Sequence, residues 1–406
     1  MGGWVNATDC DHLTLRGCVM RDAGPTTVIA RSEQVRLIDN VFSKDRVTGN
    51  MWSILECSYV LIEGNSFARV GHSPIQITTS RNVVVRANCF MNPWGRNYEF
   101  WASGRLLIEG NIITRARDSA YSADSRAKNL YLDSIFRYNR VFGNLHTPLN
   151  SGSYMPAGAR PTSYFREPFR LMNSRIYHNT ITDNLGHGWE VNGLAITANE
   201  FANNVFAGND WTGPNVQFTY GSDVSRDNRV RGNLFRGAEP DQPIISYRGE
   251  LCTVADADAR TALLEGFWSE FQDNRDADPA FVGADGRDFR LAEASGALDA
   301  GVPLALAIGA GTGSALPVTD GRPFFDGFGI EDERGDWVAI GAGDNLARIE
   351  RIELRYYLPA LLHLDREVSW TDGMPVSLPW SGEAPDAGAC ERGGSQPTRS
   401  RHLRNR

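Results

Sequence analysis

The chain has 406 residues and a formal net charge of −8, and 41% of its residues are hydrophobic. This length can hold two ordinary domains or one long solenoid with an appendage, and the hydrophobic fraction is enough for a packed core. The acidic balance argues against nucleic acid or an anionic membrane as a partner. No apolar run approaches the roughly 20 residues that cross a bilayer.

Residues 10–113 repeat one pattern with a period of 22 to 25 residues. One column of the repeat, mostly Asn, contains Cys18, Asn40, Asn65, Asn88 and Asn111. Eight residues before it lies a column of small residues: Cys10, Ser32, Cys57, Ser80 and Ser103. Apolar residues stand five and three positions before the Asn column and two positions after it. Fixed self-similarity at this spacing indicates a stack of similar coils.

The apolar pair in each repeat has the alternation of a strand with one buried face. Stacked coils would place equivalent Asn side chains about 4.8 Å apart, so we expect a buried ladder of hydrogen-bonded amides. The charges Glu63 and Glu109 lie on the other face of these strands, and we expect them to be solvated.

A leucine-rich repeat shares part of this pattern, but its return segment is helical or 3₁₀. Here the return segment is a second apolar strand rich in β-branched and aromatic residues. These strands are expected at residues 26–30, 52–56, 74–78 and 98–102. Several strands per coil without a helix predict an all-β fold, a parallel β-helix of about nine coils from residue 4 to 240.

The Asn column continues with a looser period after residue 113, at Asn139, Asn179, Asn204 and Asn233. The wide interval between the first two of these indicates an insertion at residues 145–169, rich in Gly, Pro, Ser and Tyr. Long excursions from a rigid solenoid are typical of functional loops or disorder.

The repeat ends near residue 240 and the remaining sequence changes character. Residues 257–271 have helical spacing, and residues 317–380 have the pattern of short strands in a small β module. Three regions are therefore expected. They are a β-helix at 1–250, a C-terminal part at 251–391 that holds the helix and the inserted module, and a disordered basic tail at 392–406.

The C-terminal segments DPAFV (278–282), DFRL (288–291), SGALDAG (295–301) and SGEAPDAGA (381–389) resemble the ends of secreted bacterial proteins in the pectin-lyase-like superfamily. This resemblance, with the crossover rule for parallel strands, implies a right-handed coil. It also implies a polysaccharide lyase, hydrolase or epimerase that works as a monomer outside the cell or in the periplasm. No secretory signal precedes the first coil, which we expect to reflect a truncated N-terminus.

The turns that follow the third strand of each coil are rich in charged, polar and aromatic residues. Stacking of the coils would bring these turns together into one wall. Arg115, His187 and Trp211 belong to this wall, and Gln76, Glu99 and Tyr121 are predicted to point outward beside it. The predicted substrate-binding residues are His72, Trp94, Arg96, Glu99, Arg117, Asp118, Trp189 and Glu190. Aromatic rings that stack on sugars, next to Arg that pairs with carboxylates, suit an acidic polysaccharide.

The densest polar cluster, residues 115–128, supplies the candidates for catalysis by β-elimination. This reaction needs a base and a group that neutralises the uronate carboxylate, either a basic side chain or a cation such as Ca²⁺. The predicted catalytic residues are Tyr121, Asp124, Arg126, Lys128 and His146. The cluster is similar to that of chondroitinase-B-like and alginate lyases, although Lys128 is displaced from the expected spacing.

Two other functions fit the same sequence. A glycoside hydrolase of this fold would use a pair of carboxylates, for which Glu99, Asp118, Asp124 and Glu190 are available. A non-catalytic carbohydrate-binding solenoid would keep the groove and lack turnover. The six cysteines follow no metal-ligand spacing.

Overall fold

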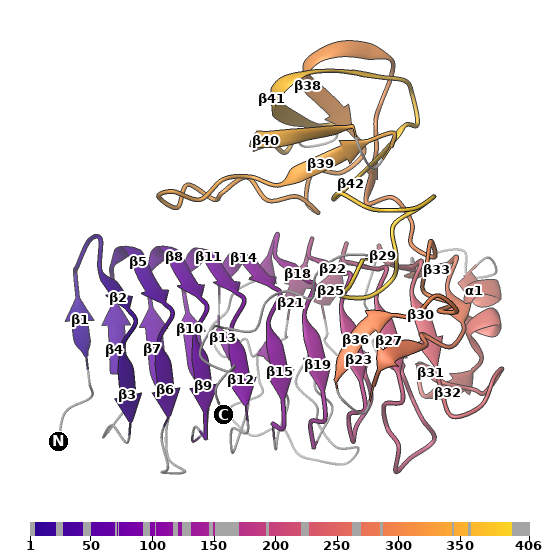
Figure 1. Ribbon diagram of the computed structural model, residues 1–406, viewed down its shortest axis with the longest axis horizontal. Coiled ribbons are helices and arrows are strands. Elements are labelled where there is room, and N and C mark those ends of the chain that lie inside the picture. Colours follow the sequence, from indigo (N-terminus) through magenta and orange to yellow (C-terminus); the bar gives the residue numbers. More distant parts are fainter. Residues whose placement is uncertain are drawn as a thin grey trace.

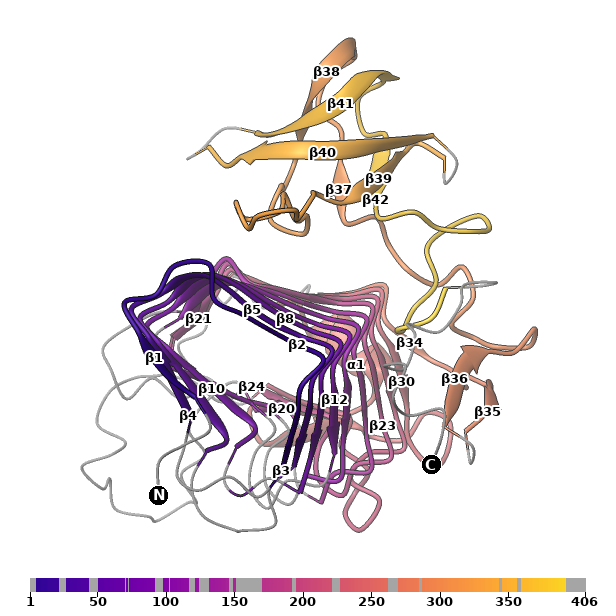
Figure 2. The same ribbon diagram turned by 60° about the vertical axis from the view of Figure 1, so that its left-hand side comes forward.

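The computed structural model describes residues 5–21, 27–43, 50–69, 71, 73–91, 98–101, 103–116, 121–123, 131–145, 149–150, 170–191, 195–220, 227–261, 269–284, 287–342, 345–355 and 359–391. Most of these residues belong to a long solenoid whose strands stack along one axis (Figure 1). A smaller β module, formed by residues from the C-terminal part of the chain, lies against one side of the solenoid (Figure 2).

Three long sheets form the walls of the solenoid, and all their pairings but the last are parallel. Sheet A contains β1 (Asn6–Thr8), β4 (Thr27–Ala30), β7 (Trp52–Leu55), β10 (Ile75–Thr78), β13 (Tyr98–Trp101), β16 (Tyr121–Ala123), β20 (Leu149–Asn150), β24 (Trp189–Val191), β28 (Phe218–Tyr220), β31 (Ile245–Tyr247) and the antiparallel β32 (Glu250–Cys252). Sheet B contains β2 (Thr14–Arg16), β5 (Glu33–Ile38), β8 (Ser58–Glu63), β11 (Arg81–Arg86), β14 (Gly104–Glu109), β18 (Ile135–Arg137), β22 (Arg175–Tyr177), β26 (Glu200–Ala202), β29 (Asn228–Arg231) and β33 (Ser269–Gln272).

Sheet C closes the cross-section, which is roughly triangular when viewed along the axis (Figure 2). It contains β3 (Val19–Arg21), β6 (Val41–Ser43), β9 (Ser66–Ala68), β12 (Cys89–Met91), β15 (Ile112–Thr114), β19 (Arg140–Phe142), β23 (Thr180–Thr182), β27 (Val205–Ala207), β30 (Leu234–Arg236) and β34 (Arg275–Asp276). A short sheet D lies between sheets A and B in the middle coils and contains β17 (Tyr131–Leu132), β21 (Arg170–Met172) and β25 (Ala195–Thr197). The predicted parallel β-helix is confirmed, and its strands continue past residue 240 to Asp276.

The predicted Asn ladder is present between sheets B and C. Asn65 and Asn88 are at most 1% exposed. The Nδ2 atom of Asn65 donates to Oδ1 of Asn88 at 3.0 Å and also to the Leu37 carbonyl at 2.8 Å. The same pattern runs through the later Asn residues of the column to Asn274. Because each amide satisfies its neighbours inside a dry core, the repeated residue fixes the register of the coils.

A helix was predicted at residues 257–271, and the structure is different there. The helix α1 occupies Val254–Thr261, and Ser269–Gln272 is strand β33. Phe271 is 3% exposed in the solenoid core. The apolar residue that suggested one face of a helix is therefore an inward residue of the last sheet B strand. Among the described residues no helix is long and apolar enough to cross a membrane.

The C-terminal β module is a small antiparallel sheet with the strand order β37-β42-β39-β40-β41-β38. Its strands are β37 (Ala305–Leu306), β38 (Gly311–Val318), β39 (Trp337–Ile340), β40 (Leu346–Glu353), β41 (Ala360–Trp370) and β42 (Pro375–Ser377). A bridge between Ala307 and Val318 joins its two edges and closes the sheet on itself. A hairpin of β35 (Phe281–Gly283) and β36 (Asp288–Leu291) precedes the module.

The segment 319–336 between β38 and β39, here called the strap, lies along the outer face of sheet B. Its buried residues Phe324, Phe325, Phe328 and Ile330 share a core with outward residues of sheet B. Those outward residues include Leu61, Val84, Leu107 and Ile135. The apolar cluster between the strap and sheet B is thus a second core, separate from the one inside the coil.

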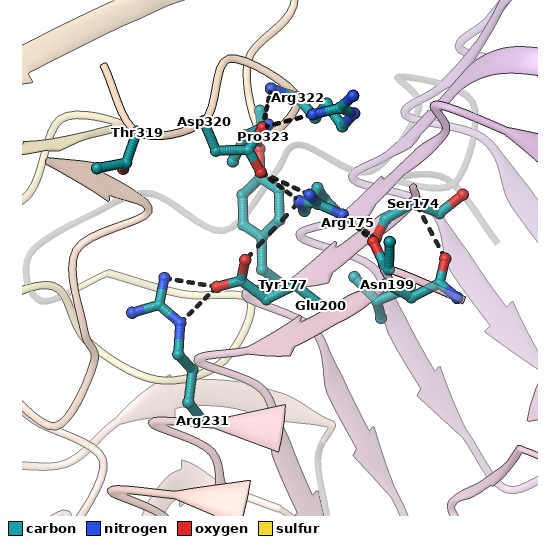
Figure 3. A network of polar contacts seen from close by, with 12 residues as sticks. Ser174, Arg175, Tyr177, Asn199, Glu200, Arg231, Thr319, Asp320, Arg322 and Pro323 are labelled. Atoms are coloured by element: carbon teal, nitrogen blue, oxygen red, sulfur yellow. Dashed lines mark hydrogen bonds and ion pairs between the residues drawn. The ribbon is translucent and has the colours of Figure 1, made fainter. Parts of the chain in front are cut away.

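Ion pairs between solenoid arginines and strap carboxylates surround this second core. Arg86 pairs with Glu63 and Glu333, and Arg175 pairs with Asp320 at 2.6 Å (Figure 3). Arg137 pairs with both Glu109 and Asp336, and its side chain is 4% exposed. The side chain of Glu109 is 20% exposed and that of Glu63 is 36% exposed, so the expectation that these outward charges are solvated is wrong for Glu109.

The C-terminal segments used for the family resemblance form a clasp. The Asp299 carboxylate accepts hydrogen bonds from the backbone N–H of Glu383 at 2.7 Å and of Ala384 at 3.1 Å. In return, Asp386 accepts from the backbone N–H of Asp299 at 2.8 Å. The two Asp residues thus tie the segments on either side of the module to each other, which explains why both contain an Asp-Ala-Gly sequence.

Candidate functional site

One register position of sheet A is occupied by polar residues in successive coils. Strand pairing places these residues in register: Ser53, Gln76, Glu99, Ser122, Asn150, Glu190, Thr219 and Ser246. The neighbours on either side of Gln76, Ile75 and Ile77, are fully buried in the coil. Because side chains alternate along a strand, the side chains of Gln76 and of Glu190 and Thr219 near the other end face away from the core. We call this register position the outer column.

Near the N-terminal end of the outer column, Gln76 is held by two neighbours. Its Oε1 accepts from Nδ2 of Asn50 at 2.8 Å and from Oγ of Ser53 at 3.3 Å. Asn50 precedes β7 in the chain. A polar side chain from outside the strands therefore meets the column at Gln76.

Near the other end, His187, Glu190 and Thr219 form a cluster. The Nδ1 atom of His187 lies 3.2 Å from Oε1 of Glu190 and 2.8 Å from Oγ1 of Thr219. The side chain of Glu190 is 10% exposed and that of His187 is 31% exposed. A carboxylate beside one ring nitrogen orients an imidazole and leaves the other nitrogen to exchange a proton. His187 is therefore a candidate general base.

The turn that carries His187 is positioned by a second Asn ladder that the sequence analysis missed. The Nδ2 atom of Asn144 donates to Oδ1 of Asn184 at 2.8 Å, and Asn184 donates to Asn209 at the same distance. Asn209 in turn donates to Oε1 of Gln217 at 2.8 Å. All four are buried. Each Asn of this ladder follows an Asn of the first ladder by five residues, and this regular spacing was the available signal.

The second ladder changes how the turns 182–189 and 207–214 are understood. Both were predicted as parts of a binding wall because of their polar residues, yet Asn184 and Asn209 are 0% exposed and structural. Trp211, in contrast, is 61% exposed. A buried amide column beneath the turns holds His187 and Trp211 at the surface, so structural and surface residues alternate within the same turns.

Two of the predicted site residues lie elsewhere than expected. Trp189 is 1% exposed and packs edge-on against Phe136 and Phe201 inside the coil, so it cannot stack on a sugar. Tyr121 was expected in one outward column with Gln76 and Glu99. The register instead pairs Ser122 with Glu99, and it pairs Tyr121 with Tyr98 and Leu149.

The remaining predicted residues divide into two groups. Glu190 lies in the outer column, and Glu99 has its register position there. Nine predicted residues lie outside the described residues: His72, Trp94, Arg96, Arg117, Asp118, Asp124, Arg126, Lys128 and His146. Their roles stay predictions. Among the described turn residues, Arg115 is exposed directly after β15.

No group of three or more His, Cys, Asp or Glu side chains that could hold a metal ion occurs in the described part of the chain. All six cysteines lie there, and no disulfide joins any two of them.

Residues 4–163 match the family model described as the right-handed β-helix region. The fold of the chain is a right-handed parallel β-helix, as predicted. A search of curated protein sequences finds no match.

Solved structures with a similar chain path include several β-helix enzymes. Pectate lyase Pel9A is 13% identical, with 70% of this chain and 72% of that chain covered and a TM-score of 0.42. A pectate lyase from a Bacillus species, solved with trigalacturonate, is 12% identical over 67% of this chain and 95% of its own, with a TM-score of 0.36. An alginate lyase from a Paenibacillus species is 10% identical over 61% and 86%, with a TM-score of 0.32.

Proposed function

We propose that this protein degrades an acidic, uronate-containing polysaccharide by β-elimination on the outer face of sheet A. The observation that carries the proposal is the cluster of His187, Glu190 and Thr219 on a polar column that runs across successive coils. Such a column offers hydrogen-bonding groups about every 4.8 Å along the axis. A polymer lying along the axis can contact it in successive sugar units.

In the proposed reaction His187 is the base. Its Nδ1 faces Glu190 and Thr219, and its Nε2 removes the proton on C5 of the uronate unit. The electron pair of the broken C–H bond forms the C4–C5 double bond, and the C4–O bond to the leaving sugar breaks. The leaving oxygen takes up a proton from water, and the proton on Nε2 of His187 is then released to water, which restores the base. The products are a new non-reducing end with an unsaturated uronate and a shortened chain.

The Glu190 carboxylate has a positioning role in this proposal. It is itself nearly buried, so it holds the imidazole in one orientation and stabilises the positive charge that forms when Nε2 takes the proton. Neutralisation of the uronate carboxylate is assigned to the basic residues of the neighbouring turns, of which Arg115 is an exposed example. Arg126 and Lys128 remain candidates from the sequence, and a bound cation such as Ca²⁺ is the alternative.

Hydrolysis is the second candidate, and the spacing of the outer column argues against one version of it. Glu99 and Glu190 are separated by three pairing steps, through Ser122 and Asn150. At about 4.8 Å per step, their strand positions lie roughly 14 Å apart. Inverting and retaining hydrolases place their carboxyl groups about 6.5–9.5 Å and 5–5.5 Å apart. This pair therefore does not suit either mechanism.

The test is incubation with alginate, polygalacturonate and chondroitin sulfate, with ultraviolet absorbance of the unsaturated uronate as the readout. We expect absorbance to rise with one of them, and His187→Ala to lower the rate about 10²- to 10⁴-fold. His363→Ala is the matched control, because His363 lies in the β module, in β41. New reducing ends without absorbance would indicate hydrolysis. Binding without any cleavage would indicate a carbohydrate-binding solenoid.

The place of action follows from the proposed substrate. A polymer of this kind lies outside the bacterial cytoplasm, so we propose an extracellular or periplasmic enzyme. Fractionation of cells that express the natural gene tests this assignment.

A further inference from the structure

A second column of residues marks the corner between sheets A and B. One residue near the start of each sheet B strand has a left-handed backbone conformation, with φ between 51° and 57°: His12, Gln34, Tyr59, Asn82 and Arg105. The repeated turn brings these residues to equivalent positions in successive coils. They line the corner along which the strap passes.

Four of the five corner residues contact the strap. The carboxylate of Glu331 lies 3.5 Å from Nδ1 of His12, and Gln34 exchanges hydrogen bonds with Gly329 and Glu331. A Cβ at Gly329 would lie 3.1 Å from the ring of Tyr59, so the strap backbone passes directly over that ring.

Arg105 makes the fourth contact, with Asp326 at 2.9 Å and with the face of the Phe328 ring at 4.7 Å. The strap is therefore fixed at both sides of the coil that carries Asn82.

Asn82 is the exception. Its side chain is 7% exposed, and its Oδ1 has no hydrogen-bond partner in the part of the chain that the structure describes. A buried carbonyl oxygen without a partner costs about 1–3 kcal/mol, so native structures rarely leave one without a function. In particular, its Oδ1 accepts no hydrogen bond from the described residues of the strap.

An open cavity of about 960 Å³ lies at this position. It is lined by Asn82 and by residues of four successive coils, namely Glu56, Cys57, Ser58, Tyr59, Thr79, Ser80, Arg81, Gly104, Arg105 and Asp133. A smaller cavity of about 250 Å³ shares Arg105 and Asp133 with it and continues between the solenoid and the module. Four coils correspond to roughly 14 Å along the axis. The cavity is thus an elongated groove parallel to the solenoid, on a different face from the outer column.

We propose that this groove binds an uncharged stretch of a saccharide chain, as an accessory site that holds the polymer without cleaving it. The unpaired Oδ1 of Asn82 needs a hydrogen-bond donor, which a sugar hydroxyl supplies and an ionised carboxylate or phosphate does not. The ring of Tyr59 offers an apolar surface of the size of a sugar face. The hydroxyl groups of Ser58 and Thr79 can both donate and accept.

The charges of the groove support an uncharged ligand. Arg105 is already paired with Asp326, and Asp133 is paired with Arg322 at 3.3 Å. Glu56 and Arg81 are exposed and of opposite sign, so the lining has no net excess of either charge. A polyanion would therefore gain little binding free energy from the charges of this groove. The hydroxyl groups of a neutral saccharide, in contrast, can bond to both the donors and the acceptors of its lining.

The test is calorimetric titration of the full chain with cellohexaose, xylohexaose, laminarihexaose and hexagalacturonate. We expect at least one neutral hexasaccharide to bind, and Asn82→Gly and Arg81→Ala each to raise its Kd tenfold or more. Glycine is the chosen replacement because it adopts the positive φ of Asn82 without strain. The matched controls are Asn215→Gly, which also has a positive φ of 65°, and Arg16→Ala, an exposed strand-end arginine like Arg81.

Three results would overturn the proposal. They are no binding by any probe, binding of hexagalacturonate alone, or the same Kd for the groove variants and the controls. A Glu190→Gln variant separates this proposal from the proposed enzymatic function. Loss of cleavage in Glu190→Gln with unchanged binding of the neutral probe would leave the accessory groove intact. The accessory groove therefore stands or falls independently of the lyase reaction.

Discussion

The outer faces of sheets A and B are built by the same coils and the same strand alternation, yet they differ in what they present. Sheet A has polar residues at one register position from Ser53 to Ser246, and those with described side chains, such as Gln76 and Thr219, face away from the core. Sheet B presents an apolar column, with Leu61, Val84 and Leu107 in register, beside a column in which the charges alternate. An outward face of this second kind cannot remain in water without cost, and the strap covers it.

The difference shows how to recognise a covered face of a solenoid. In the segments VLIE, VVVR and LLIE, three apolar residues are consecutive, so the middle one must point out of the coil. The alternating charges after them, Glu63, Arg86, Glu109 and Arg137, pair between coils and with the strap. Polar columns without this apolar partner, as on sheet A, are the faces left for ligands.

The largest expected effect is at the buried ion pairs of sheet B. Burial alone would lower the pKa of Arg137, but the carboxylates of Asp336 and Glu109 more than offset this and raise the pKa well above its usual value. Arg137→Ala leaves both carboxylates without their partner, so we expect the free energy of unfolding to fall by about 3–5 kcal/mol. Urea denaturation measures this. A shift no larger than that of the exposed control Arg16→Ala would show that the strap is not held by these charges.

The apolar part of the covered face is tested by Leu107→Ala. Leu107 is 0% exposed although it points out of the coil, so truncation leaves a cavity beneath the strap. We expect a loss of about 2–5 kcal/mol in unfolding free energy. If the face were open to water, the same substitution would lower the free energy of unfolding by no more than about 0.5 kcal/mol.

A pH effect is expected from His178, which lies near Asp386 of the clasp and stacks on Tyr138. Burial lowers the pKa of His178 to about 4 from its usual 6.5, so the folded state keeps it neutral. The contribution of neutral His178 to the free energy of unfolding is therefore complete above pH 6.5, and it is lost as the pH falls toward 4. At about 1.4 kcal/mol per pKa unit, this amounts to on the order of 3 kcal/mol.

The measurement for His178 is the urea midpoint at a series of pH values between 7 and 4, for the natural chain and for His178→Gln. We expect the variant to lose less stability over this range than the natural chain. His363→Gln in the β module is the control. Parallel curves for the natural chain and His178→Gln would contradict a neutral buried histidine.

A smaller effect is expected at the first Asn ladder. Asn88→Ala leaves the backbone N–H of Asn65 and the Ile62 carbonyl without their present partner, because both bond to the Asn88 amide. We expect a loss of about 1–3 kcal/mol. Glu109 would not serve as a solvated comparison, since it is part of the Arg137 network. The proper control for Asn88→Ala is the substitution of a residue in the outer column.

The smallest effect on stability is expected at that column. Gln76 is only half-buried, so Gln76→Ala should cost about 1 kcal/mol or less. If sheet A is the substrate face, the same variant should nevertheless weaken binding of the polysaccharide in a titration. An unfolding shift as large as that of Leu107→Ala would mean that sheet A is a covered face like sheet B.

The sequence alone determined the coil. The period, the alternation and the Asn column specify strands, register and core, because each repeat imposes the same local geometry and neighbouring amides must satisfy one another. The outward position of Gln76 was also available from this pattern. The pairing of His187 with Glu190 was within reach, since a turn of Gly and His leads directly into the strand that carries Glu190.

Only the tertiary structure decided what covers each face. The ion pairs of Arg86 with Glu333 and of Arg137 with Asp336 join residues about 200 or more positions apart, and no local pattern links such partners. The inward position of Trp189 followed from pairing across an insertion, where the loosened period no longer fixed the register. Whether an outward residue is buried depends on which distant segment packs on it. The sequence therefore shows that the middle leucines point out of the coil. Only the tertiary structure shows that the strap lies over them.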